Sequence, residues 1–184
     1  MFIYSRQGKI VTEILQHLHA CNNSVEVFYG RKEELECMKK YITSTNNRPY
    51  TLFGSGGSGK TALLSKVATK CMTATYQKPN GGSPNLRGFL KNKEWVLTGK
   101  PLLVVRYCGT TPDSSSLAPL LTSICQQLSY CFILQFENIP TDLVPLTAYM
   151  KDLLNRATQN QPIVVCLDSG KNFSHNRLFH AIVN

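Results

Sequence analysis

Two patterns of apolar and polar positions follow each other along the chain, and they predict helices and buried strands in turn. Apolar residues recur every three or four positions, which is helical spacing, in the segments 10–21, 32–43, 60–71, 117–128 and 143–158. Nearly continuous apolar runs without that period, typical of strands buried on both faces, occupy 50–53, 101–107 and 163–167. Helices therefore separate the strands as in βαβ units. This order predicts an α/β fold, in which a parallel sheet with helices on both faces forms a three-layer sandwich.

A glycine-rich loop directly after the predicted strand 50–53 carries the strongest functional signal in the sequence. It has the form G-x-x-x-x-G-K-[ST], and a predicted helix follows it, which is the context that a phosphate-binding P-loop requires. Glycine lets such a loop wrap closely around phosphate with its backbone amides turned inward, and the start of the helix adds a positive dipole end. The residues expected to bind the nucleotide are Gly54, Ser55, Gly56, Gly57, Ser58, Gly59, Lys60 and Thr61.

Two side chains of the loop and one outside it have predicted roles. We expect Lys60 to place its ammonium group on the β- and γ-phosphates, and Thr61 to give its hydroxyl to Mg²⁺. Their partner should be an acidic residue at the end of a neighbouring buried strand, and Asp168 follows the apolar run 163–167. Two alternatives remain open. For the loop, the alternative is a flexible glycine turn without a ligand. For Asp168, the alternative is the cap of a turn, since Asp-Ser-Gly is also a turn sequence.

Length and composition are those of one globular domain. The chain has 184 residues, of which 42% are hydrophobic and 17% charged, and this excludes a disordered protein. It has no secretory signal and no apolar run of about 18 residues, so we expect a cytoplasmic protein without a membrane span. The seven cysteines include no C-x-x-C pair, and we interpret them as buried thiols in a reducing compartment.

The net charge of +9 leaves the kind of partner open. Such a charge suits an anionic partner such as nucleic acid or a membrane surface. The basic residues are scattered rather than clustered, however, so we interpret them as a solvated surface and do not expect nucleic acid as a partner. His17 and His19 lie two positions apart on a predicted helix and therefore point to different faces. We expect no metal site other than the one for magnesium.

Three further segments resemble a known family. Residues 28–35, with the sequence FYGRKEEL, resemble the GRxxEL segment of the signal-transduction P-loop NTPases, which include the NACHT domains. Residues 104–115 resemble the second strand and following loop of the NACHT and WD-repeat proteins, and residues 121–128 resemble a later part of the same proteins. The resemblance extends over residues 10–169, which is most of the chain.

The resemblance implies a P-loop NTPase fold in which residues 54–61 are the Walker A loop and Asp168 is the first Walker B acid. It also implies that Gly30 and Arg31 lie near the base of the nucleotide. Proteins of this family are nucleotide-dependent switches, in which ATP or GTP favours one arrangement of the domains while the rest of the chain forms oligomers or binds partners. We therefore expect three parts in this chain: an N-terminal helical segment at 1–23, the N-terminal part of a NACHT-type domain at 24–169, and a divergent tail at 170–184.

The sequence departs from the family pattern after Asp168. In the family a second acidic residue follows and helps to activate water, whereas no Asp or Glu occurs after Asp168 here. The sensor strand and the lids of the family are also missing, so we expect a fragment or truncated isoform, incomplete at its C-terminus, with very slow hydrolysis. Arg106 is a further candidate near the phosphates, and the alternative is a solvated residue at the end of a strand. The last of the predicted strands would be an uncovered sheet edge, which favours self-association or a protein partner.

Three functions fit these residues. The first is a switch module that binds a purine nucleotide and Mg²⁺ with weak or no hydrolysis. The second is an active enzyme, either an NTPase or a P-loop kinase. The third is a nucleotide-independent regulator that pairs with a full-length NACHT protein. No guanine-reading N-K-x-D sequence follows the predicted strands, which favours ATP over GTP.

Overall fold

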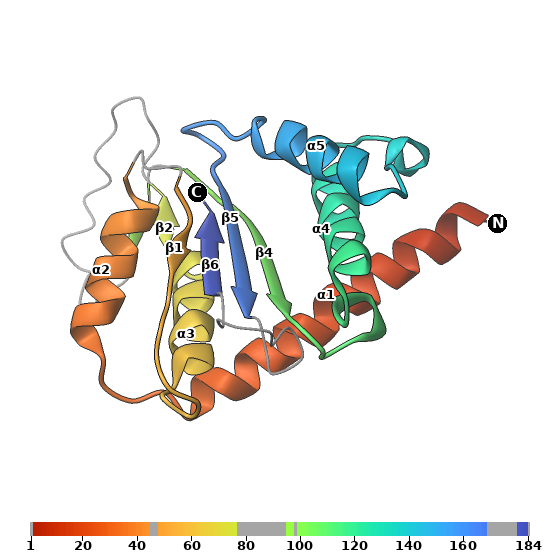
Figure 1. Ribbon diagram of the computed structural model, residues 1–184. Coiled ribbons are helices and arrows are strands. Elements are labelled where there is room, and N and C mark those ends of the chain that lie inside the picture. The colour runs from red at the N-terminus through yellow and green to blue at the C-terminus, as the bar shows by residue number, and fades with distance from the viewer. Residues whose placement is uncertain (1, 45–47, 77–94, 98, 169–179, 184) are drawn as a thin grey trace.

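The computed structural model describes residues 2–44, 48–76, 95–97, 99–168 and 180–183 (Figure 1). Its α-helices are α1 (Phe2–Glu26), α2 (Lys32–Ile42), α3 (Lys60–Met72), α4 (Leu117–Cys131) and α5 (Leu143–Leu154). The short 3₁₀ helices η1 (Pro112–Ser114) and η2 (Phe136–Asn138) precede and follow α4. Its strands are β1 (Tyr50–Thr51), β2 (Thr75–Tyr76), β3 (Val96–Leu97), β4 (Leu102–Tyr107), β5 (Ile163–Asp168) and β6 (His180–Val183). Each helix and strand that the sequence predicts is present.

Helix α1 extends beyond the predicted segment 10–21 at both ends. At its C-terminal end the polar residues 22–24 do not break it. Their side chains bind within the helix instead: Ser24 Oγ donates to the carbonyl of Ala20 at 2.9 Å, and Asn23 Nδ2 lies 3.2 Å from His19 Nε2. His17 is fully buried on this helix whereas His19 is exposed. The prediction that the two histidines point to different faces is therefore confirmed.

The main sheet has four strands in the order β1–β6–β5–β4. Strands β4 and β5 are parallel, and β6 is antiparallel to both β5 and β1. The prediction of a parallel sheet is therefore correct for β1, β5 and β4 and wrong for β6, which comes from the tail of the chain. Because β6 pairs with β5, the expectation that the Asp168 strand is an uncovered edge is also wrong. Strands β2 and β3 form a separate parallel pair.

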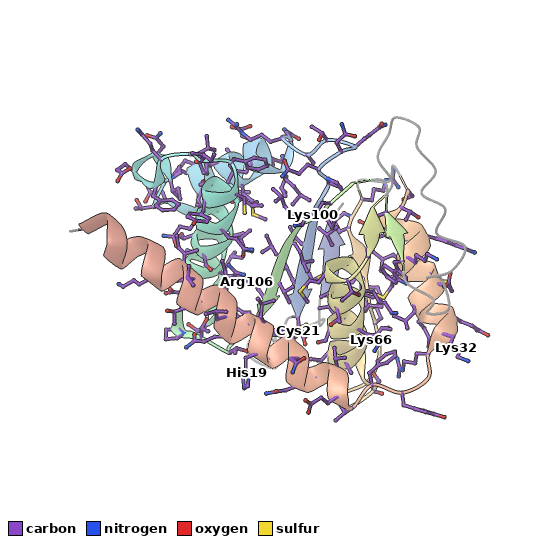
Figure 2. The ribbon with its side chains drawn as sticks, turned by 180° about the vertical axis from the view of Figure 1, so that it is seen from behind. His19, Cys21, Lys32, Lys66, Lys100 and Arg106 are labelled. Atoms are coloured by element: carbon purple, nitrogen blue, oxygen red, sulfur yellow. The ribbon has the colours of Figure 1, made fainter. Side chains whose placement is uncertain are left out.

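Helices cover both faces of the main sheet, as the two views in Figures 1 and 2 show. Alternate residues of a strand point to opposite faces. Val105, Tyr107 and Cys166 therefore pack in a core with α1, α2 and α3, whereas Val104 and Val165 pack in a second core with α4 and α5. The α/β class with helices on both sides of the sheet agrees with the sequence prediction.

The structure bears on two predictions drawn from composition, one about membrane spans and one about the cysteines. In the described part of the chain, no helix is both long and apolar enough to cross a membrane. All the cysteines lie in this part and are free thiols. Most are at least partly buried, as predicted, but Cys37 on α2 and Cys131 at the end of α4 are exposed.

Candidate functional site

The glycine-rich loop lies between β1 and α3, in the strand–loop–helix order that the sequence predicts. Gly59 is the N-cap of α3 and has a φ of 81°, a left-handed conformation that glycine adopts without strain. At Gly54 the chain folds closely onto itself, since a Cβ atom there would lie 2.9 Å from Ser58 Oγ. These two positions therefore favour glycine, and the loop is a closed turn followed by a helix.

Lys60, the first residue of α3, is buried against this loop, with 8% of its surface exposed. Its Nζ atom donates to the carbonyl groups of Gly54 and Ser55 at 2.8 Å each and to Ser58 Oγ at 3.2 Å. All three acceptors are neutral, and no carboxylate in the described ranges forms an ion pair with this ammonium group. A buried positive charge among neutral acceptors favours an anion as an additional partner.

Backbone amides near the start of α3 are also open to a ligand. The amide of Ser58 donates to the carbonyl of Ser55 at 3.2 Å and closes the turn. The amides of Gly57, Gly59 and Lys60 donate to no acceptor within the described residues, and no side chain caps the helix. Unpaired amides at a helix N-terminus are a favourable site for phosphate groups. The next residue, Thr61, is exposed, so its hydroxyl is accessible.

The segment that carries Gly30 and Arg31 reaches the loop from the start of α2. Both residues have left-handed backbone conformations, with φ values of 76° and 49°, and they form the turn between α1 and α2. The guanidinium of Arg31 donates to the carbonyl of Ser58. It also lies beside Gly59, where an added Cβ atom would be 3.7 Å from Arg31 Nη2. The structure therefore brings Arg31 onto the loop, with Gly30 next to it.

Asp168 is the last residue of β5 and is buried. Cys166, two positions earlier, packs in the core beneath α3, so Asp168 belongs to the same face of the sheet. The carbonyl of Asp168 accepts a hydrogen bond from the amide of Cys108 at 2.7 Å. Since β1 and β5 run in the same direction, their carboxyl ends lie at the same end of the sheet. Asp168 is therefore at the end of the sheet where the glycine loop leaves β1.

One strand, β6, lies between Asp168 and the strand that leads into the loop. In the sheet register Thr51 pairs with Ala181, and Ala181 pairs with Leu167, so β1 ends level with the end of β5. Two strand spacings place the backbones of β1 and β5 about 10 Å apart. The inserted strand was not predicted, and its only signal in the sequence is the short apolar run at 181–183.

A buried polar cluster lies at the same end of the sheet, beside the last residue of β4. No spacing of residues in the sequence predicts this cluster. His17 Nδ1 accepts a hydrogen bond from the amide of Tyr107 at 3.1 Å, so the proton of the neutral ring is on Nε2. His17 Nε2 in turn donates to Glu13 Oε1 at 2.9 Å, and Thr111 Oγ1 donates to the same carboxylate oxygen at 2.7 Å. These contacts fasten α1 to the carboxyl end of β4.

Arg106 lies on the opposite face of the sheet, against α4, and has 1% of its surface exposed. Its Nε and Nη2 atoms donate to Oγ and the carbonyl of Ser123 at 3.1 and 3.3 Å, and Nη1 donates to the carbonyl of Val105 at 2.9 Å. Burial lowers the pKa of Arg106 to about 10, and the charge of Glu13 opposes this shift. The structure supports neither predicted role of Arg106, because the residue is neither solvated nor on the face of the glycine loop.

Protonation of His17 should destabilise the fold. Burial lowers the pKa of His17 below 6.5, while the hydrogen bond to Glu13 opposes the shift and the charge of Arg106 adds to it. The unfolded chain then binds the proton more readily than the folded chain, so stability is complete above about pH 6.5 and decreases as the pH falls. We expect the free energy of unfolding in urea to decrease from pH 7 to pH 5, and to decrease less in His17→Gln. An equal decrease in the variant would assign the effect to other groups.

Comparison with known proteins gives relatives for most of the chain. No protein-family model and no solved structure matches it. It is 28% identical over 167 residues to human "NACHT and WD repeat domain-containing protein 2", and the match covers 89% of this chain and 9% of that protein. The mouse protein of the same name is 28% identical over 160 residues, with 85% and 8% covered. Human "NACHT domain- and WD repeat-containing protein 1" is 31% identical over 123 residues, with 65% and 6% covered.

These matches cover most of this chain but only a small part of each relative. The chain spans 8% and 9% of the length of the mouse and human proteins numbered 2. Similarity at 28% identity over most of the chain supports a relationship to the NACHT and WD repeat-containing proteins.

Proposed function

We propose that this chain is a NACHT-type switch module that binds a purine nucleoside triphosphate, ATP rather than GTP, together with Mg²⁺. The observation that carries the proposal is the environment of Lys60. Its buried ammonium group contacts neutral acceptors inside a glycine loop, beside unpaired amides at the start of a helix. The similarity to proteins whose names include the NACHT domain supports the same class of module.

The loop supplies the phosphate contacts in this proposal. The amides of Gly57, Gly59 and Lys60 bind phosphate oxygens, as unpaired amides at a helix start do elsewhere. The Lys60 ammonium group exchanges the carbonyls of Gly54 and Ser55 for the β- and γ-phosphates. A charged acceptor forms a stronger hydrogen bond with an ammonium group than a neutral carbonyl does, so this exchange is favourable.

Thr61 and Asp168 are the residues that would hold the metal ion. Hydroxyl and carboxylate oxygens are ligands that suit Mg²⁺. Thr61 is the second residue of α3, directly after the loop, and Asp168 is the last residue of β5. When bound, Mg²⁺ neutralises charge on the phosphates. Gly30 and Arg31 would border the base, since Arg31 contacts the loop at Ser58.

Hydrolysis by this module should be very slow. Turnover requires a residue that positions or activates water, and the residues directly after Asp168, at 169–173, include no Asp or Glu. We expect phosphate release from ATP well below about 1 per second, a rate typical of competent enzymes. A faster rate that is lost in Lys60→Met would show that the module is an active NTPase.

Titration of the purified protein with fluorescent ATP and fluorescent GTP, each in Mg²⁺ and in EDTA, tests the proposal. The expected result is saturable binding that is tighter for ATP than for GTP and tighter in Mg²⁺ than in EDTA. Absence of binding to both nucleotides would contradict the proposal and favour the nucleotide-independent regulator. The WD repeats in the relatives' names suggest that the module also acts with protein partners.

A further inference from the structure

Tyr107, the last residue of β4, contacts the helix that carries one of the two proposed magnesium ligands. Its hydroxyl forms a hydrogen bond with Ser65 Oγ on α3, and Ser65 Oγ donates to the carbonyl of Thr61 at 2.8 Å. The Ser65 hydroxyl has a single proton and gives it to Thr61, so Tyr107 is the donor in the bond between the two hydroxyls. One tyrosine hydroxyl therefore connects β4 to the first turn of α3.

The backbone of Tyr107 is connected to the second proposed ligand. Tyr107 and Asp168 are opposite each other in the parallel β4–β5 ladder, and the amide of Cys108 donates to the carbonyl of Asp168 at 2.7 Å. Tyr107 packs in the core beneath α3, and the alternation along β5 puts Asp168 on the same face. Thr61 and Asp168 are on different elements, and Tyr107 links these elements.

Tyr107 is itself held in place from several sides. It has 6% of its surface exposed, its amide donates to His17 Nδ1 at 3.1 Å, and its carbonyl accepts from Ser114 Oγ at 3.1 Å. Strand β4 is at the edge of the main sheet, and α1 covers this edge at His17. Figure 2 shows α1 running past β4 and α3 on this side of the molecule. Burial raises the pKa of the Tyr107 hydroxyl, so it stays a donor at neutral pH.

We propose that Tyr107 is a positioning residue for the nucleotide-bound metal ion: through Ser65 it sets the placement of Thr61 relative to Asp168. This inference rests on the proposed function. The contacts of phosphate with the loop amides and Lys60 do not pass through Tyr107. Removal of its hydroxyl should therefore weaken the part of nucleotide binding that depends on Mg²⁺ and leave the metal-free part unchanged.

The test is the ratio of the Kd of fluorescent ATP in EDTA to its Kd in Mg²⁺, measured in wild type, Tyr107→Phe, Ser65→Ala and the double variant. We expect each single variant to lower this ratio about threefold to tenfold, the range that the loss of one hydrogen bond produces. The double variant should lower it no further than Ser65→Ala alone, because that change already removes the bond to Tyr107 together with the bond to the Thr61 carbonyl. The Kd in EDTA should stay at the wild-type value in all variants.

Tyr149→Phe is the matched control. Tyr149 on α5 forms a hydrogen bond of 3.1 Å with Ser129 Oγ on α4, a similar tyrosine–serine pair in the core on the other face of the sheet. This variant should lose similar stability and keep the wild-type Kd ratio, which separates a positioning role from general destabilisation. If circular dichroism shows that Tyr107→Phe does not fold, the Kd ratio of Ser65→Ala alone tests the positioning role.

Two results would overturn the inference, and they differ in what else they affect. A wild-type Kd ratio in both Tyr107→Phe and Ser65→Ala would remove the positioning role and leave the proposed function intact. A wild-type protein that binds no nucleotide, or binds it equally well in Mg²⁺ and EDTA, would contradict the proposed nucleotide and metal site and this inference with it.

Discussion

Replacement of Lys60 by methionine should weaken the binding of fluorescent ATP at least about tenfold. A hydrogen bond to a charged group contributes about 1.5–3 kcal/mol, which corresponds to a factor of roughly 10 to 150 in Kd. Methionine retains most of the aliphatic stem, so the buried position against the loop stays filled. The carbonyls of Gly54 and Ser55 lose a donor but belong to exposed residues that water can reach. The Kd is measured by titration in Mg²⁺.

Lys66→Met on the same helix controls for the change in net charge. Lys66 does not contact the loop: its Nζ atom lies over the ring of Phe28, 5.7 Å from the ring centroid. We expect this variant to bind fluorescent ATP with a Kd within about twofold of wild type, since long-range charge effects are largely screened in physiological salt. Similar losses in both variants would mean that overall positive charge, rather than the glycine loop, attracts the nucleotide.

The parts of the candidate site that the sequence predicts are those with a local signature. The glycine loop is one of them, because its strand, its glycines and the helix after it are consecutive in the chain, and the structure has them in that order. The end of β5 at Asp168 is another, because a continuous apolar run before an acidic residue marks a buried strand that reaches the edge of a sheet. In both cases the physical cause lies within about ten residues.

The parts that the sequence does not predict depend on contacts between distant segments. Strand β6 pairs with β1 and β5 although it is far from β1 in the chain, and only the three apolar residues 181–183 carry the signal. His17 and Tyr107 are separated by 90 residues, and a histidine on a helical pattern does not indicate which amide it will accept from. Arg106 is the clearest case, because a charged residue near the end of a strand is ordinarily solvated.

Replacement of Arg106 by alanine should destabilise the fold by about 3 kcal/mol or more. The side chain fills space against α4 and donates to the carbonyl groups of Ser123 and Val105. Its removal leaves a cavity and takes a donor away from the buried carbonyl of Val105, and it takes away the positive charge that acts on buried Glu13. Each of these effects lowers stability. The measurement is the free energy of unfolding from denaturation in urea.

Two further variants separate the contributions of packing and charge at Arg106. Arg106→Met fills most of the space, so it should recover part of the loss but stay less stable than wild type, since Glu13 still lacks its positive neighbour. Arg156→Ala is the matched control: Arg156 is exposed over the ring of Phe132, and its loss should cost less than about 1 kcal/mol. A cost below about 1 kcal/mol for Arg106→Ala as well would contradict the burial of this charge, because a solvated guanidinium contributes little to stability.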